Sequence, residues 1–212
     1  MHTRASAIRT MAAAAVMALA ASAGGCGSGH SAPPNCLQVQ PCGGDVVGNW
    51  SFLGACFDAQ AQSADFALSC PGGKINATGV SLTGTLNFNA DLSYTATNWH
   101  EVFLASETIP LSCSGMASCT ERNGTETDTS NGSTVTVTTT CSGTTTCDCR
   151  VNGSLTLTSD FGSYTTTGTS LNMYGGTTSG LFDYCVEQDR LHLLNLSSSG
   201  QVVSDIVAAR TP

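Results

Sequence analysis

Apolar and polar residues alternate along most of the chain after Gly44, which is the pattern of strands with one buried face. In GVSLTGTLNFNA, residues 79–90, the Val, Leu and Phe residues fall on one face and Ser, Thr and Asn on the other. Threonine on the polar face favours strand over loop, and the pattern predicts antiparallel sheet. We expect ten strands, at residues 46–57, 77–89, 92–100, 102–112, 133–142, 147–158, 162–172, 179–187, 190–196 and 201–209.

Two segments depart from the period of two. In FDAQAQSADFAL, residues 57–68, apolar residues recur at helical spacing after Asp58, a candidate N-cap, so we expect at most one short helix. The polar segment at residues 120–133 is expected to be an exposed loop. Many short strands joined by turn signals indicate an all-β barrel or sandwich, with a single domain at residues 45–212.

The N-terminus has the pattern of an export signal at residues 1–25. Arg4 and Arg9 precede an apolar stretch of small residues that is too short to be a comfortable transmembrane span. The stretch ends in AGGC, which resembles the lipobox of bacterial lipoproteins, although Ala23 stands where that motif prefers Leu. The resemblance implies a lipid anchor on Cys26 and a flexible tether at residues 26–44. The alternative is an ordinary secretory signal cleaved after the ASA of residues 21–23.

The eleven cysteines support export and the anchor together. If Cys26 carries lipid, an even number remains, which in an exported chain predicts a framework of up to five disulfides. Three C-x5-C spacings are compatible with local bridges, Cys56 and Cys185 form a natural long-range pair across a closing barrel, and two cysteines remain for each other. The expected pairs are Cys36–Cys42, Cys113–Cys119, Cys141–Cys147, Cys56–Cys185 and Cys70–Cys149.

Charge and motifs restrict the functions that the chain can have. Removing residues 1–25 would take away two of the seven basic residues and none of the fifteen acidic ones, changing the formal charge from −8 to −10. Nucleic acid and anionic headgroups would repel so acidic a chain, so we expect neither as a partner. The histidines beyond residue 26, His30, His100 and His192, belong to no catalytic or nucleotide-binding motif. We therefore expect no enzyme activity and no cofactor.

Metal binding is a further alternative for three of the cysteines. Cys141, Cys147 and Cys149 lie close enough in sequence to ligate zinc, but no histidine is near them to complete a mixed site. An oxidising compartment also favours disulfides over thiolate ligands. We expect no metal site.

Several short motifs together resemble lipocalins and lipocalin-like bacterial domains. VVGNWSF at residues 46–52 is similar to their Gly-x-Trp first strand, and GTLNFNADLSYTAT at residues 84–97 to a strand–turn–strand unit. The resemblance implies an antiparallel up-and-down barrel with possible small-molecule binding. The chain departs from the usual eight-stranded pattern in its extra strands and in its far higher cysteine count, so we expect about eight to ten strands stapled by disulfides. The resemblance also implies that Arg210, near the closing strand, packs on Trp50 as a structural cation–π pair at one barrel end.

Two functions fit this reading. The first is a membrane-anchored exported lipoprotein of the cell envelope, on the outer membrane or cell surface if the cell is Gram-negative, whose barrel binds a small hydrophobic ligand. The alternative is a structural or interaction protein of the envelope with a filled core and no ligand.

Overall fold

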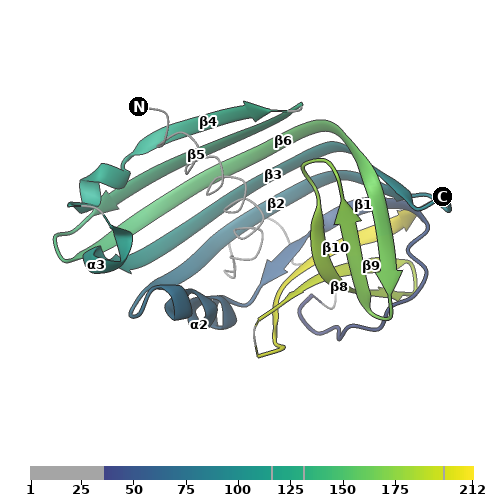
Figure 1. Ribbon diagram of the computed structural model, residues 1–212, viewed down its shortest axis with the longest axis horizontal. Coiled ribbons are helices and arrows are strands. Elements are labelled where there is room, and N and C mark those ends of the chain that lie inside the picture. The colour runs from purple at the N-terminus through teal and green to yellow at the C-terminus, as the bar shows by residue number, and fades with distance from the viewer. Residues whose placement is uncertain (1–35, 116, 131, 198) are drawn as a thin grey trace.

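The computed structural model describes residues 36–115, 117–130, 132–197 and 199–212, and in them ten antiparallel strands form one sheet (Figure 1). The sheet closes on itself through pairing of β3 with β6, which makes a barrel of eight strands. This confirms the predicted all-β barrel. The strands are β1 (Gly48–Phe57), β2 (Lys74–Phe88), β3 (Ser93–Pro110), β4 (Gly124–Ser130), β5 (Ser133–Ser142), β6 (Thr146–Thr167), β7 (Ser170–Tyr174), β8 (Gly180–Glu187), β9 (Arg190–Leu196) and β10 (Val202–Thr211).

Each barrel strand pairs with its neighbour in the chain, except that the β4–β5 hairpin stands between β3 and β6 in sequence. Along one edge, β6 pairs first with β5, over residues 148–157, and then with β7, over residues 163–167. The first half of β6 therefore belongs to a sheet that projects from the barrel (Figure 1). We name this sheet the extension; it consists of β4, β5 and the parts of β2, β3 and β6 beside them.

A row of backbone irregularities separates the barrel from the extension. The registers of β2 and β3 shift at Gly84 and at Asn98, whose φ is 51°. A Cβ on Gly84 would lie 2.8 Å from the carbonyl oxygen of Asn98, so this close approach requires glycine. The shift exchanges the faces of β3: Ala96 points inward before it, and Trp99 points inward after it.

One helix of appreciable length is present in the described residues, as predicted. This is α2 (Ala59–Ser69), and the Asp58 side chain caps it by accepting hydrogen bonds from the backbone N–H groups of Gln60 and Ala61, both at 2.9 Å. α2 lies along β2, where the Ser63 hydroxyl donates to the carbonyl of Ile75. The remaining helical turns are α3 (Leu111–Ser114) and η1 (Cys119–Arg122). No helix in the described part of the chain has both the length and the hydropathy needed to span a membrane.

All ten cysteines beyond Cys26 form disulfides, but every predicted pairing is wrong. The observed bridges are Cys36–Cys56, Cys42–Cys185, Cys70–Cys113, Cys119–Cys147 and Cys141–Cys149. One error has a clear cause in β1. The register shifts between Phe52 and Gly54, so Cys56 does not share the inward face of Trp50 and bonds to Cys36 instead. At the far end, Cys141 and Cys149 face each other directly on β5 and β6.

The boundary of the predicted tether is also corrected. Residues 36–44 lie against the barrel, held by the Cys36–Cys56 and Cys42–Cys185 bridges. The backbone N–H of Gly43 donates to the carbonyl of Tyr184, and the N–H of Val186 donates to that of Gly43. We name residues 36–46 the strap. Cys26 and the rest of the expected tether lie outside the described residues.

The predicted loop at residues 120–133 is wrong, because most of it is η1 and the edge strand β4. On one face of this hairpin, threonines of β4 meet threonines of β5, as in the pair Thr125–Thr138, whose hydroxyl oxygens are 2.8 Å apart. Thr127–Thr136 and Thr129–Thr134 repeat the contact. Cross-strand hydroxyl pairs thus stabilise a strand that has little apolar area to bury.

Candidate functional site

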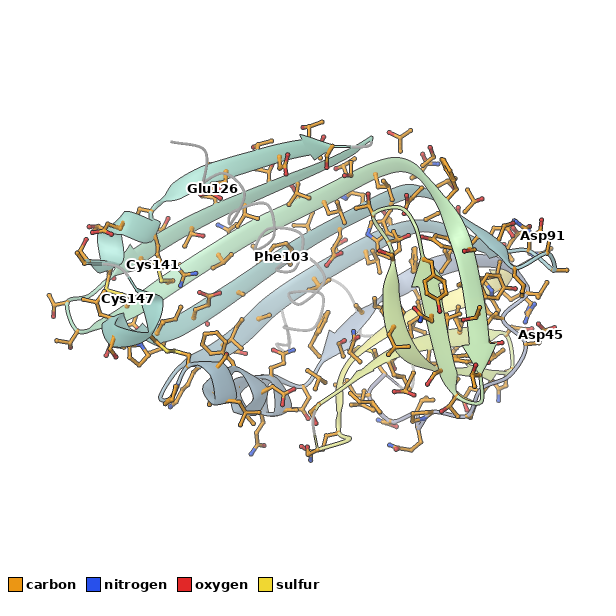
Figure 2. The ribbon with its side chains drawn as sticks, in the orientation of Figure 1. Asp45, Asp91, Phe103, Glu126, Cys141 and Cys147 are labelled. Atoms are coloured by element: carbon orange, nitrogen blue, oxygen red, sulfur yellow. A yellow bond between two sulfur atoms is a disulfide. The ribbon has the colours of Figure 1, made fainter. Side chains whose placement is uncertain are left out.

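The two ends of the barrel differ in how their inward-facing side chains are arranged. At the end that Asp45 and Asp91 mark in Figure 2, the guanidinium carbon of Arg210 lies 4.3 Å from the centroid of the Trp50 ring. This is the contact that the lipocalin resemblance implied. Arg210 also donates to the backbone carbonyls of Val47, at 2.6 Å, and Asp45, at 3.0 Å. These contacts close this end, with both terminal nitrogens of the guanidinium engaged.

Gly48 and Trp50, the Gly-x-Trp of the sequence, have separate roles in that closure. A Cβ on Gly48 would lie 2.6 Å from Nη1 of Arg210, so glycine makes room for the guanidinium. The Trp50 ring is fully buried, and its Nε1 donates to the carbonyl of Val46 at 2.7 Å. The motif is therefore architectural.

Aromatic rings fill the barrel between its ends. Phe88 and Tyr164 meet edge to face with centroids 4.8 Å apart, and Phe52 meets Trp99 in the same way at 4.6 Å. Phe52 and Trp99 are nearer to the extension, because they lie beside the irregularities in β1 and β3. The second pair thus marks the end of the barrel that opens toward the extension.

A carboxyl group lies at this second end, within the apolar inner face. Glu101 follows Trp99 on the inward side of β3, and in the sheet it stands between Leu82 of β2 and Leu155 of β6. Its residue surface is only 4% exposed. Phe103 is the next inward residue on the strand, so apolar or aromatic side chains flank the carboxyl in every direction along the sheet.

Burial raises the pKa of Glu101 from its ordinary value of 4.5 to about 7, and the nearby Trp99 indole opposes this rise in part. Among the described residues no basic side chain forms an ion pair with Glu101. Trp99 Nε1 lies near the carboxyl without meeting the geometry of a hydrogen bond, and it is a buried donor without a partner. An acid and an N–H donor thus lie together in an apolar wall, and the indole N–H makes no hydrogen bond of good geometry.

Beyond Glu101, the inner face of the extension stays apolar. Phe103, which Figure 2 labels in the middle of the extension, lies directly over Gly153, where a Cβ would come within 1.8 Å of its ring. Ala105 and Val151 continue the same face, and Val137 of β5 packs against them. The apolar inner face therefore continues from the barrel onto the extension, with Glu101 as the acid at the junction.

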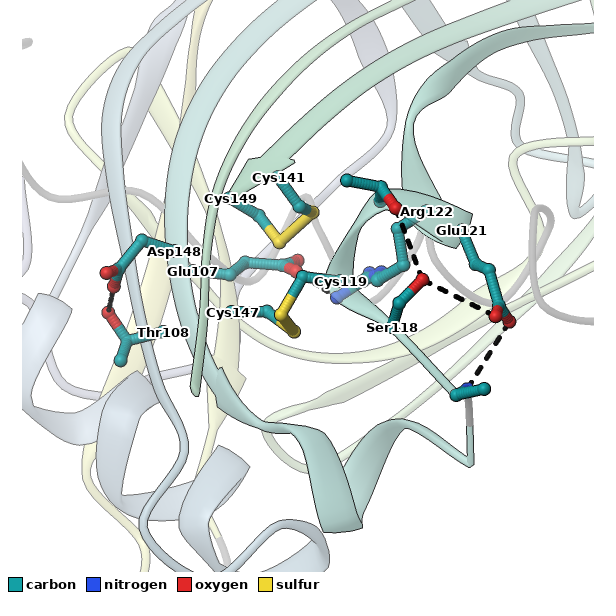
Figure 3. Close-up of a disulfide and its surroundings, with 12 residues drawn as sticks. Glu107, Thr108, Ser118, Cys119, Glu121, Arg122, Cys141, Cys147, Asp148 and Cys149 are labelled. Atoms are coloured by element: carbon teal, nitrogen blue, oxygen red, sulfur yellow. Dashed lines mark hydrogen bonds and ion pairs between the residues drawn. A yellow bond between two sulfur atoms is a disulfide. The ribbon is translucent and has the colours of Figure 1, made fainter. Parts of the chain in front are cut away.

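Most other polar clusters of the described residues are satisfied within the fold, although the side-chain amide of Gln62 on α2 and Nε2 of His192 are also buried without a hydrogen-bond partner. Figure 3 shows the far end of the extension, where Arg122 and Glu107 form an ion pair at 2.9 Å beside two disulfides. The Asp160 carboxylate accepts from both the N–H and the hydroxyl of Thr178. In the described residues no group of three or more metal-binding side chains is placed to hold an ion.

A second buried pair lies under the strap. His192 Nδ1 is 2.9 Å from Oδ2 of Asp205, and that oxygen also accepts from the backbone N–H of Leu37. Both side chains are fully buried on the outer face of β9 and β10. The pair therefore anchors the strap and has no exposed nucleophile to activate.

Sequence reasoning missed Glu101 because it placed this residue between two predicted strands, at residues 92–100 and 102–112, whereas a single strand, β3, runs through it. Strict alternation through β3 would in turn have put Glu101 on the outer face. The register shift at Asn98 reverses that assignment, and the signal for it was present in the chain. Inward Tyr94 and Ala96 are followed by Trp99, so the apolar period breaks by one residue at Asn98.

Fold and site together define a disulfide-stapled antiparallel barrel with one closed end and one end that continues into an apolar sheet. No protein-family model, curated protein or solved structure matches the chain. Its five disulfides indicate an oxidising compartment outside the cytoplasm.

Proposed function

We propose that this protein is a lipid-anchored, lipocalin-like binding protein that holds a small hydrophobic molecule at the Trp99–Glu101 site. The observation that carries the proposal is the buried Trp99 indole N–H, which makes no hydrogen bond of good geometry, beside the buried carboxyl group of Glu101 in an apolar wall. A polar group in an apolar wall costs about 1–3 kcal/mol when it lacks a partner. A ligand that supplies the missing partner would recover this free energy.

The chemistry of the two groups restricts the ligand. One end of the ligand must accept a hydrogen bond from Trp99 Nε1 and interact with the Glu101 carboxyl group. A hydroxyl group does both most simply. The remainder must be apolar, because Phe52, Phe103, Leu82 and Leu155 surround these groups. A long-chain alcohol or another hydrophobic molecule with one hydroxyl meets both requirements.

The proposal includes no catalytic step. The remaining buried acids are engaged by Arg122, Thr178 and His192, and each of those contacts links two elements of the fold. The Trp99–Glu101 pair lacks a neighbouring nucleophile such as a serine or cysteine on the inner face of β3. Binding, with no bond made or broken, is the activity that these residues support.

The anchor on Cys26 would keep the barrel close to the membrane from which a hydrophobic ligand comes. The strap begins at Cys36, so about ten residues separate the anchor from the barrel, a reach of roughly 35 Å when fully extended. Replacing Cys26 by Ser should release the protein from the membrane fraction. Unchanged fractionation would refute the anchor without affecting the proposed ligand.

Straight-chain alcohols from octanol to hexadecanol provide the binding test, monitored by tryptophan fluorescence. The chain has two tryptophans, one at each end of the barrel, which makes them a matched pair of variants. Trp99→Phe removes the N–H donor and should weaken binding about tenfold, as expected for one lost hydrogen bond in an apolar site. Trp50→Phe changes the closed end and should leave the affinity unchanged.

The result against the proposal is equally specific. If no alcohol in the series binds, or if Trp50→Phe and Trp99→Phe weaken binding equally, the Trp99–Glu101 pair is not the site. The protein would then fit the alternative, a structural envelope protein, which the fully buried aromatic side chains of the barrel favour.

A further inference from the structure

Three large apolar side chains form a row on the outer face of the barrel. Phe161 of β6, Tyr174 of β7 and Leu181 of β8 are 77%, 45% and 67% exposed. Tyr174 stands opposite Ser163, two residues from Phe161, and Leu181 stands opposite Asn172, two residues from Tyr174. Each member is therefore the diagonal neighbour of the next, about 7–8 Å away and within reach of an aromatic side chain.

Exposed apolar side chains in a contiguous group commonly mark a binding surface. The inward positions of the same strands hold Tyr164, Met173 and Tyr184, which are buried in the core. The core of these strands is thus complete without the row.

The central ring of the row is held in place by polar neighbours. The amide nitrogen of Asn172 donates to the Tyr174 hydroxyl at 2.7 Å, and Thr165 Oγ1 lies 3.4 Å from it. Because its hydroxyl is held, the ring loses little conformational freedom when a partner stacks on it. A rigid aromatic ring beside short amide and hydroxyl side chains is also the composition of polar recognition surfaces.

The surroundings of the row are short polar side chains and one carboxylate, Asp183, which is the next outward residue after Leu181 on β8. The other outward residues of β6 and β7 near it are Ser, Thr and Asn, and residues 161–187 contain no Lys or Arg. Glu187 lies farther along β8, and the whole chain carries a net charge of −8. A surface of this kind repels acidic polymers and anionic lipid.

We propose that the row formed by Phe161, Tyr174 and Leu181 binds a neutral polysaccharide. The apolar C–H faces of sugar rings stack on the two aromatic rings, and sugar hydroxyls exchange hydrogen bonds with Asn172, Thr165 and Ser163. Neutral sugars suit a surface that has a carboxylate but no Lys or Arg, and their ring hydroxyls match the amide and hydroxyl groups around Tyr174 and the Asp183 carboxylate. The proposal is independent of the Trp99–Glu101 site, which lies on the inner face of the sheet.

The experiment measures depletion of the purified protein by insoluble neutral glycans: amorphous cellulose, chitin and a β-1,3-glucan. We expect at least one of them to bind it. Phe161→Ala and Tyr174→Ala should each weaken binding about tenfold, as truncation of a central aromatic contact does at interfaces. Tyr174→Phe keeps the ring but loses its polar contacts, and should give a smaller loss. Both positions are exposed, so these variants should fold.

Leu68→Ala is the matched control, because Leu68 is equally exposed but lies on α2. It should leave binding unchanged, as should Trp99→Phe. Three results would overturn the proposal. The first is no depletion by any of the three glycans, the second is depletion that neither aromatic substitution weakens, and the third is evidence that the row binds another partner. The last is recognised when Phe161→Ala abolishes binding to phosphatidylcholine vesicles, or dissociates a dimer in sedimentation, while glycan binding persists.

Discussion

Replacing Glu101 by Gln should stabilise the protein at neutral and alkaline pH. Gln keeps the size and polarity of the side chain but cannot ionise. In the folded chain the pKa of Glu101 is raised to about 7, against an ordinary value of 4.5, because ionisation is unfavourable in the apolar wall. The ionised carboxylate therefore opposes folding, and Gln removes that opposition.

The size of the effect follows from the two pKa values. The unfolded chain holds fewer protons than the folded chain between pH 4.5 and 7, so the stability of the wild type falls as the pH rises through this window. The stability that the raised pKa of Glu101 contributes to the wild type is fully present below pH 4.5 and fully lost above about pH 7. At ~1.4 kcal/mol per pKa unit, the loss is about 3 kcal/mol.

Guanidinium unfolding between pH 4 and pH 8.5 measures this difference directly. The free energies of unfolding of Glu101→Gln and wild type should agree near pH 4, separate between pH 4.5 and 7, and differ by about 3 kcal/mol at pH 8. Glu126→Gln is the control, because Glu126 lies exposed on β4 and its removal should give a small difference that does not grow with pH. Parallel curves for Glu101→Gln and wild type would refute the buried, perturbed carboxyl group.

Two further substitutions test the packing. Gly153→Ala places a Cβ against the Phe103 ring and should lower the free energy of unfolding by about 1–3 kcal/mol. The same change in a Phe103→Ala background should cost close to nothing, and an equal cost in both backgrounds would contradict the contact. Arg210→Lys keeps the charge at the closed end but loses the planar group that stacks on Trp50 and donates to two carbonyls, so chemical unfolding should show a loss of about 1–2 kcal/mol, and no loss would show that charge alone suffices there.

The barrel and its closed end are readable from the sequence because each rests on a local signal. Alternation in segments such as residues 79–90 predicts strands, and Asp58 predicts the start of α2. The Trp50–Arg210 contact follows from the family resemblance, and the structure shows it at 4.3 Å. An even number of cysteines beyond the anchor candidate likewise predicts that all ten form bridges.

What could not be predicted depends on single-residue shifts in register. One extra residue near Leu53 turns Cys56 away from the core, so Cys56 does not form the predicted bridge to Cys185 across the closing barrel. One extra residue at Asn98 turns Glu101 inward, which creates the candidate site. Strand β4 was missed for another reason: its sequence, GTETDTS, has no apolar side chain and therefore no apolar period to detect.

Native mass spectrometry of the protein isolated from its own cells without denaturation tests the proposed binding function most directly. We expect a noncovalent adduct with the mass of a hydrophobic hydroxyl-bearing molecule, lost on denaturation and reduced in Trp99→Phe but not in Trp50→Phe. A covalent lipid on Cys26 would remain after denaturation and is thereby distinguished. A protein whose native and denatured masses agree would contradict the claim that the Trp99–Glu101 site holds a ligand.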